Sequence, residues 1–232
     1  MSHRFAYDER PRHEAAGIDY ERLYEFRFRH VTQRERNGVW HEIARTVYDW
    51  LGRPQRVLDA AAGHGEFIDA VPAREKWAID AVDFLGPRDD VHKVIGDIRD
   101  VALPERHFDA IFVSNFLEHL AHADEIGALL QRFRAASVFG GRIAVLGPNF
   151  RYCARTYFDC ADHKVALTHL SVEEHLYAAG YQIERVIPRF LPYSFRGVLP
   201  TAPALVRAYL KFAPAWQVLG RQYLVIGVNP GR

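Results

Sequence analysis

The sequence contains little sulfur. Two cysteines, Cys153 and Cys160, and a single methionine occur among its 232 residues. The cysteines do not form a Cys-x-x-Cys pair, so the chain lacks the spacing typical of a zinc site built on cysteine. We expect both thiols to be reduced, as in a cytoplasmic protein.

Long apolar runs and an excess of one charge are also absent. No stretch approaches the about 18 consecutive apolar residues of a membrane-spanning helix, and residues 1–12 lack the apolar centre of a secretion signal. The 30 basic residues balance 29 acidic ones, for a net charge of +1. A near-neutral chain is not built mainly to grip a nucleic-acid backbone. We therefore expect a cytoplasmic protein with no membrane partner and no nucleic-acid partner.

Apolar segments of strand and helix character alternate along most of the chain. Such alternation is typical of an α/β fold with a mostly parallel sheet and helices on both faces. We predict seven strands, at 56–60, 76–82, 91–95, 107–114, 141–147, 181–187 and 222–228. We predict helices between them at 66–71, 123–137, 171–179 and 204–212, with a capping box formed by Ser171 and Glu174.

The segment before the first strand has apolar residues at helical spacing from Ile18 to Leu51. The Asn37-Gly38 pair predicts a break into two helices, and Gly52 predicts the end of the second. We accordingly divide the chain into an N-terminal helical cap, residues 1–52, and a main domain, residues 53–232. A proline-rich helical insertion is expected near 191–220.

A glycine-rich turn follows the first predicted strand, in VLDAAAGHGEF (57–67). A dinucleotide-binding turn would require a third glycine after Gly63 and Gly65, and none is present. A nucleotide-phosphate loop would require a lysine after its last glycine, which is also missing. The turn therefore favours neither NAD nor ATP.

Four motifs in order resemble those of class I S-adenosylmethionine (SAM)-dependent methyltransferases. They are Asp59 with Gly63 and Gly65, the acid Asp80 at the end of the second predicted strand, Gly96-Asp97-Ile98, and SNFLEHL at 114–120. The resemblance implies a Rossmann-like methyltransferase fold with an antiparallel last strand, and SAM as cofactor. It implies that Asp80 accepts the ribose hydroxyls. Asp83, three residues later, is the alternative.

The resemblance also implies a set of cofactor-binding residues. Arg27 would hold the SAM carboxylate, and Asp59 would reach the ammonium group. Ala61 stands where the family often has glycine. The full set is Arg27, Asp59, Ala61, Gly63, Gly65, Phe67, Asp80, Asp97, Ile98, Ser114 and Asn115.

The acceptor is expected to be an oxygen, since SNFLEHL does not resemble the Asn/Asp-Pro-Pro-Tyr motif of amine methyltransferases. A neutral hydroxyl needs a base or a Lewis acid. His119 and His163 are the candidate bases, with Asp162 to orient one of them. Glu118-His119 also resembles the Glu-x-x-Glu-His metal motif of magnesium-assisted O-methyltransferases, with Asn115 replacing the first glutamate. A Mg²⁺ site on Glu118 and His119 is thus the alternative.

Residues 186–210 and the Asp162-His163 loop resemble bacterial, including mycobacterial, sugar O-methyltransferases of methylmannose polysaccharide synthesis. This implies a small sugar or oligosaccharide acceptor, such as a partly methylated mannoside modified at its anomeric hydroxyl, and leaves a homodimer open. RNA 2′-O-methylation, a non-catalytic SAM-fold subunit and a nicotinamide oxidoreductase are the rival hypotheses. Five aromatic residues are candidates to stack on a sugar: Tyr152, Tyr157, Phe158, Tyr193 and Phe195.

Overall fold

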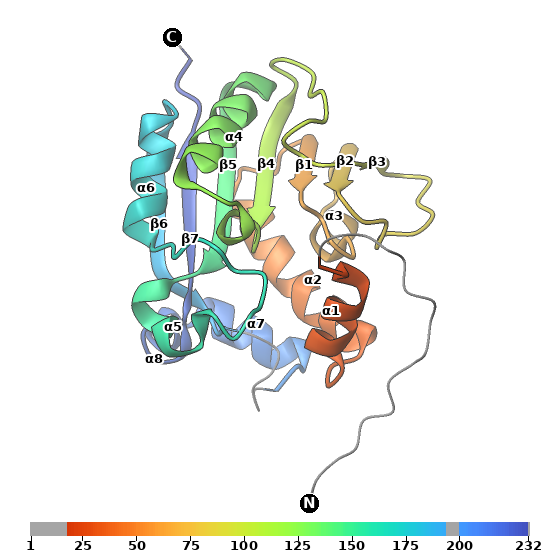
Figure 1. The fold of residues 1–232 in the computed structure, drawn as a ribbon, viewed down its shortest axis with the longest axis vertical. Helices are drawn as coiled ribbons and strands as arrows, with labels where there is room; N and C mark the ends of the chain where they lie inside the picture. Colours follow the sequence, from red (N-terminus) through yellow and green to blue (C-terminus); the bar gives the residue numbers. More distant parts are fainter. Residues whose placement is uncertain (1–17, 194–199, 232) are drawn as a thin grey trace, which may run out of the picture.

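A computed structural model describes residues 18–193 and 200–231 of the chain, and Phe195 lies outside these ranges. Within them, seven strands form one sheet in the order β3-β2-β1-β4-β5-β7-β6 (Figure 1). The strands are β1 (Arg56–Ala60), β2 (Glu75–Asp80), β3 (His92–Ile95), β4 (Phe108–Ser114), β5 (Ser137–Pro148), β6 (Gln182–Leu191) and β7 (Gln222–Val228). Strand β7 runs antiparallel to both β5 and β6, whereas the other neighbours pair in parallel. The predicted fold, including the antiparallel last strand, is confirmed.

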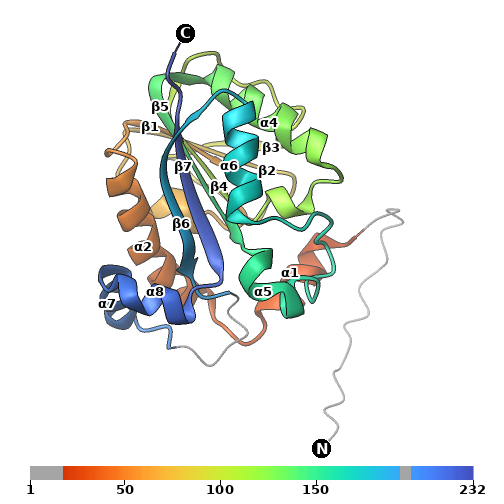
Figure 2. The same cartoon turned by 90° about the vertical axis from the view of Figure 1, so that its left-hand side faces the viewer.

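Helices cover both faces of the sheet (Figure 2). They are α1 (Tyr20–Phe28), α2 (Gln33–Trp50), α3 (Glu66–Ala70), the 3-10 turn η1 (Leu117–His119), α4 (Ala123–Ala136), α5 (Phe150–Tyr157), α6 (His169–Ala178), α7 (Pro203–Lys211) and α8 (Ala213–Leu219). Helices α4 and α6 lie on one face, and α2 lies on the other together with α7 and α8. Because side chains alternate along a strand, Val57 packs in the α2 layer and Leu58 in the α4 layer.

The predicted break at Asn37-Gly38 is wrong, because α2 continues through both residues. A capping box between Thr32 and Glu35 starts the helix earlier and satisfies its first backbone N–H groups. Gly38 lies where α2 packs against α7. A Cβ at this position would lie 3.2 Å from Cγ of Pro203, at the start of α7. The glycine therefore lets α2 and α7 approach each other.

Two further differences concern helices near the carboxyl half. The capping box of α6 uses Thr168 and Ser171, not Ser171 and Glu174, so the helix begins at His169. Helices α5 and α8 were not predicted. None of the helices within residues 18–193 and 200–231 has the length and apolarity to span a membrane.

Candidate active site

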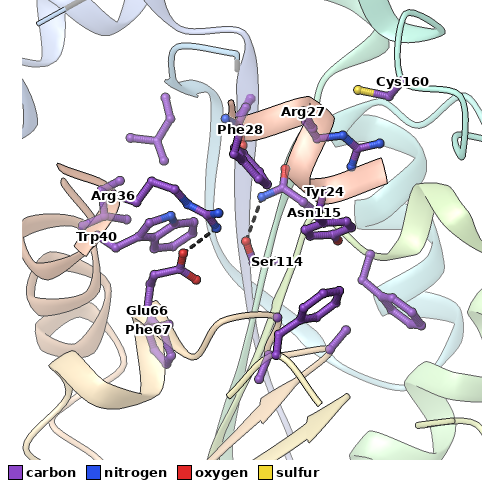
Figure 3. Close-up of a pocket in the computed structure, with 18 of the residues that line it drawn as sticks. Tyr24, Arg27, Phe28, Arg36, Trp40, Glu66, Phe67, Ser114, Asn115 and Cys160 are labelled. Carbon is purple, nitrogen blue, oxygen red and sulfur yellow. Dashed lines mark hydrogen bonds and ion pairs between the residues drawn. The ribbon is translucent and has the colours of Figure 1, made fainter. Parts of the chain in front are cut away.

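A cavity of about 1020 Å³ opens at the carboxyl ends of β1, β2 and β4. Such edges of parallel sheets are where α/β proteins bind ligands. Figure 3 shows side chains from α1, α2, α3 and β4 converging on it. Nearly all predicted site residues line this cavity: Arg27, Asp59, Ala61, Gly63, Phe67, Asp80, Asp97, Ile98, Ser114, Asn115, Glu118, His119, Asp162 and His163. Gly65 does not, and its part in the turn is structural.

The turn after β1 depends on left-handed backbone conformations. Gly63 and Gly65 have φ values of +55° and +78°, and Ala61 has +62°. An alanine in this region is strained, which accounts for the glycine that the resembling family often has at this position. A Cβ on Gly65 would lie 2.7 Å from Cδ2 of Leu85, whereas one on Gly63 would meet nothing within 4 Å. Gly65 is therefore required for packing, and Gly63 leaves space at the cavity wall.

Two carboxylates stand at the ends of β1 and β2. Asp59 is 2% exposed, and its Oδ2 is buried with no hydrogen-bond partner. Burial, together with nearby Glu66, raises the pKa of Asp59. Asp80 accepts hydrogen bonds from the backbone N–H groups of Gly63 (2.7 Å) and Val82 (3.0 Å). Asp83, the alternative to Asp80, does not line the cavity and pairs instead with Lys93 at 2.9 Å.

Helix α1 reaches across the cavity mouth through Arg27. Its guanidinium donates a hydrogen bond to Asp162, in the segment after α5. Both side chains are largely buried, at 12% and 2% exposure. Arg27, predicted to bind the carboxylate of SAM, therefore forms an ion pair with Asp162, a predicted catalytic residue.

A second buried ion pair, between Arg36 of α2 and Glu66 of α3, was not predicted (Figure 3). Each side chain is 8% exposed. The pair joins the long N-terminal helix to the helix that follows the glycine turn. Helical spacing alone gave no signal for it, because its partners are distant in sequence.

Glu118, His119, Asp162 and His163 form a polar cluster at one side of the cavity, called the acid–histidine cluster below. His119 Nδ1 lies 3.0 Å from the backbone oxygen of Asp162 and 3.5 Å from its Oδ2. His163 Nε2 lies 4.0 Å from Oε1 of Glu118. The two imidazole rings meet edge to face, with centroids 5.0 Å apart. The structure thus brings the four predicted residues together.

Burial dominates the protonation of this cluster. It raises the pKa of Glu118 and lowers that of His163 to about 4. Asp162 behaves differently. Although burial opposes its ionisation, His119 and Arg27 hold its pKa below the ordinary value. Asp162 is therefore an anion and His163 a neutral imidazole near neutral pH.

The remaining predicted cofactor residues have partners within the protein. The Asp97 carboxylate pairs with Arg99, with Nε at 2.9 Å. Asn115, which has a φ of +49°, donates a hydrogen bond to the Ser114 hydroxyl at 2.9 Å. Phe67 stacks on the Phe112 ring at a centroid distance of 3.8 Å.

Of the predicted sugar-stacking residues that the structure describes, Tyr193 alone lines the cavity. Tyr157 is fully buried and donates its hydroxyl to the Val165 carbonyl. Tyr152 stacks on His169, and Phe158 is exposed on the surface. Asp159 and His169, in the same sequence segment as Asp162, also lie outside the cavity.

Part of the cavity wall is apolar, and apart from Phe67 its residues were not among the predicted site residues. We call these residues, contributed by α2, α7 and their surroundings, the apolar arm. It comprises Val39, Trp40, Ile43, Phe67, Phe112, Leu205, Val206 and Leu219. Each belongs to a periodic apolar pattern, so the sequence signal is indistinguishable from that of the core.

Comparison with known proteins locates the fold. No protein-family model and no curated protein matches the sequence. A SAM-dependent methyltransferase from Archaeoglobus fulgidus has a similar structure, with a TM-score of 0.66 and 18% identity over 90% of this chain and 100% of that chain. One from Mesorhizobium loti has a TM-score of 0.58 and 17% identity over 79% and 97%. A chain in the complex between the Haloferax volcanii Trm112 methyltransferase activator and a methyltransferase has a TM-score of 0.61 and 16% identity, over 91% of this chain and 95% of that chain.

The fold is therefore the Rossmann-like methyltransferase fold. The seven-stranded sheet with its antiparallel last strand matches this fold, although the sequence identity is only 18%.

Proposed function

We propose that the chain is a SAM-dependent methyltransferase. The observation that carries this proposal is the buried carboxylate of Asp59, a residue of the cavity wall whose Oδ2 has no hydrogen-bond partner. The ammonium group of a sulfonium amino acid supplies the missing hydrogen bond and charge there. Asp80, at the end of the next strand, would accept ribose hydroxyls in addition to the hydrogen bonds from its two backbone donors. Bound SAM supplies an electrophilic methyl group.

We further propose that the acceptor atom is a hydroxyl oxygen. In this reaction the O–CH₃ bond forms while the S–CH₃ bond breaks, and the sulfonium becomes the neutral thioether of S-adenosylhomocysteine (SAH). The acceptor must also lose its proton. The acid–histidine cluster supports this step, because it places imidazole and carboxylate groups at the cavity wall. The cluster acts either through His119 or His163 as base or through a bound cation.

The proposed acceptor is a carbohydrate, with a partly methylated mannoside as the specific candidate. Tyr193 supports sugar stacking, and the polar cluster supports hydroxyl recognition. The apolar arm favours a more particular form of this substrate: a glycoside that carries an apolar group next to its sugar. A free hexose would leave the half-buried Trp40 and the exposed Leu205 in contact with water, which is unfavourable for apolar surface.

Two of the four arginines at 27–36 give no support to RNA 2′-O-methylation. Arg27 and Arg36 are buried in ion pairs and so do not face a phosphate backbone, which leaves only Arg29 and Arg34 exposed. A catalytic role is favoured over a non-catalytic subunit by the intact cavity and its charged residues.

The test is transfer of labelled methyl from SAM to a matched series: free mannose, methyl mannoside and octyl mannoside. We expect label in the glycosides on a ring hydroxyl, because their anomeric oxygen is already alkylated, and label at the anomeric oxygen would require free mannose. The octyl compound should give the lowest KM, because its chain occupies the apolar arm. Trp40→Ala should reduce the preference for octyl over methyl mannoside. Label confined to RNA, or absent from every hydroxyl compound, would contradict the proposed acceptor class.

A further inference from the structure

We infer that Glu118, His119 and His163 form a binding site for one divalent transition-metal ion, of the Zn²⁺, Mn²⁺ or Fe²⁺ class. One ligand atom from each of these residues lies within 4.8 Å of the others. Binding of the ion stands on the geometry of this chain alone. Its chemical role, the activation of an acceptor hydroxyl, rests on the proposed function.

The strongest observation is the state of Glu118. The side chain is 1% exposed, and both carboxylate oxygens are buried without a hydrogen-bond partner. Burying a carboxylate in this way is costly unless a charge or donor compensates it. A cation between Glu118 and the two imidazoles supplies that compensation.

The backbone holds the ligands in place. The carbonyl oxygen of Glu118 accepts hydrogen bonds from the N–H groups of Lys164 (2.8 Å) and Val165 (3.1 Å). This clamp joins η1 to the segment that follows His163, so residues distant in sequence meet at one point. Ligands held in place by main-chain hydrogen bonds are characteristic of a preorganised binding site.

His119 is oriented for coordination through Nε2. Its Nδ1 lies 3.0 Å from the backbone oxygen of Asp162, so Nδ1 carries the proton and donates it. The other ring nitrogen is then left with a free lone pair. An imidazole whose second nitrogen donates to a carbonyl or carboxylate is the usual arrangement around a bound metal.

His163 completes the set. Its Nε2 lies 4.0 Å from Oε1 of Glu118, and its side chain is 4% exposed. Ligands of a tetrahedral ion at about 2.1 Å lie roughly 3.4 Å apart, so binding requires the cluster to contract by roughly 1 Å. Rotation about the side-chain bonds of His163 and Glu118 supplies a movement of this size.

The donor set decides the class of ion. Two imidazoles and one carboxylate suit Zn²⁺, Mn²⁺ and Fe²⁺, whereas Mg²⁺ prefers oxygen ligands. Asn115 replaces the carboxylate that would make the set richer in oxygen. Three protein ligands leave at least one position for the oxygen of a water or hydroxyl group, and a bound ion would lower the pKa of that group. His119 and His163 then serve as ligands, not as bases.

The test is a titration of the chelator-treated, full-length protein with Co²⁺, read by its visible d–d absorption and by thermal shift. We expect one ion per chain, with Zn²⁺ displacing Co²⁺ and excess Mg²⁺ failing to displace it. Glu118→Gln and His163→Ala should each weaken Co²⁺ binding by more than about 100-fold. The matched control is His122→Ala, an exposed histidine close in sequence to His119, which should bind as the wild type does.

The same variants are titrated with SAH, to separate this inference from the proposed function. Loss of Co²⁺ affinity with SAH affinity retained supports the metal site. Wild-type Co²⁺ affinity in Glu118→Gln, or no Co²⁺ binding by the wild type, overturns it. Glu118→Gln decides the matter if His163→Ala does not fold. Co²⁺ binding without any SAH binding would reject the proposed function and leave the metal site standing.

Discussion

Arg27 donates a hydrogen bond to Asp162, which lies 135 residues later in the chain. The first residue belongs to the helix over the cavity, and the second belongs to the segment that carries His163. Since Asp162 also contacts His119, one carboxylate links the N-terminal helix to the acid–histidine cluster. The position of α1 and the geometry of the cluster are therefore coupled.

This coupling is measurable by a double-mutant cycle of Arg27→Gln and Asp162→Asn. Each single change removes one partner of a buried ion pair, and we expect each to lower the free energy of unfolding by about 3 kcal/mol. The double variant should lose clearly less than the sum, with a coupling energy of about 1–3 kcal/mol. Urea unfolding measures all three variants. Additive losses would mean that the pair contributes no mutual stabilisation.

Asp80 and Asp83 provide a matched pair for the cofactor site. Asp80 lines the cavity and Asp83 pairs with Lys93 outside it. We expect Asp80→Asn to weaken SAH binding by about 10- to 100-fold, the effect of one charge-assisted hydrogen-bond pair. Asp83→Asn should leave SAH affinity within about twofold, which is too small for a lost hydrogen bond. Isothermal titration calorimetry gives both values, and a reversed order would assign the ribose contact to Asp83.

Replacing Gly63 or Gly65 of the turn by alanine should affect stability and SAH affinity differently. Gly65→Ala combines a left-handed φ with a contact on the buried Leu85 side chain, and should cost about 2 kcal/mol of stability. Gly63→Ala should cost about 1 kcal/mol. Its new methyl group meets no protein atom within 4 Å but stands at the cavity wall, so it should also reduce SAH affinity. Thermal unfolding and calorimetry on both proteins separate the effects. Equal losses of affinity would count against Gly63 as the closer contact.

The buried His169, which lies outside the cavity, should make the stability of the protein depend on pH. His169 is 9% exposed, and its Nδ1 accepts a hydrogen bond from Asn149 Nδ2 at 3.0 Å. Burial lowers the pKa of His169 below its ordinary value of 6.5. The folded state therefore binds fewer protons than the unfolded state, so stability is full above the unfolded pKa and falls as pH drops below it.

Between about pH 7.5 and about pH 5.5, we expect the wild type to lose about 1 kcal/mol more stability than His169→Gln, the value of one hydrogen bond. Urea unfolding at the two pH values measures the difference. His122→Gln, at an exposed histidine, should follow the wild type. Parallel curves for the wild type and His169→Gln would show that His169 titrates normally.

Local patterns were sufficient to predict the sheet. The bounds of β1 and β7 agree with the strands expected from their apolar residues, because each strand is a short apolar run between turn residues. The N-terminal helices show where such reasoning fails. Asn37-Gly38 is a typical breaking signal, yet α2 continues through it and lies close to Pro203 there. Tertiary contact outweighed local propensity.

The site was predictable where motif residues adjoin strand ends, as with Asp59 and Asp80. It was not predictable where side chains meet across the sequence. Nothing local indicates that Arg27 pairs with Asp162, or that Arg36 pairs with Glu66. Trp40 and Ile43 read as core residues because a buried helix face and a cavity wall require the same apolar side chains.

The most direct test of the whole account is a calorimetric titration of the wild-type protein with SAH, run beside the same titration with NAD. We predict one SAH bound per chain and no heat from NAD, since the cavity offers Asp59 and Asp80 but lacks the third glycine of a dinucleotide turn. Saturable binding of NAD with none of SAH would contradict the account.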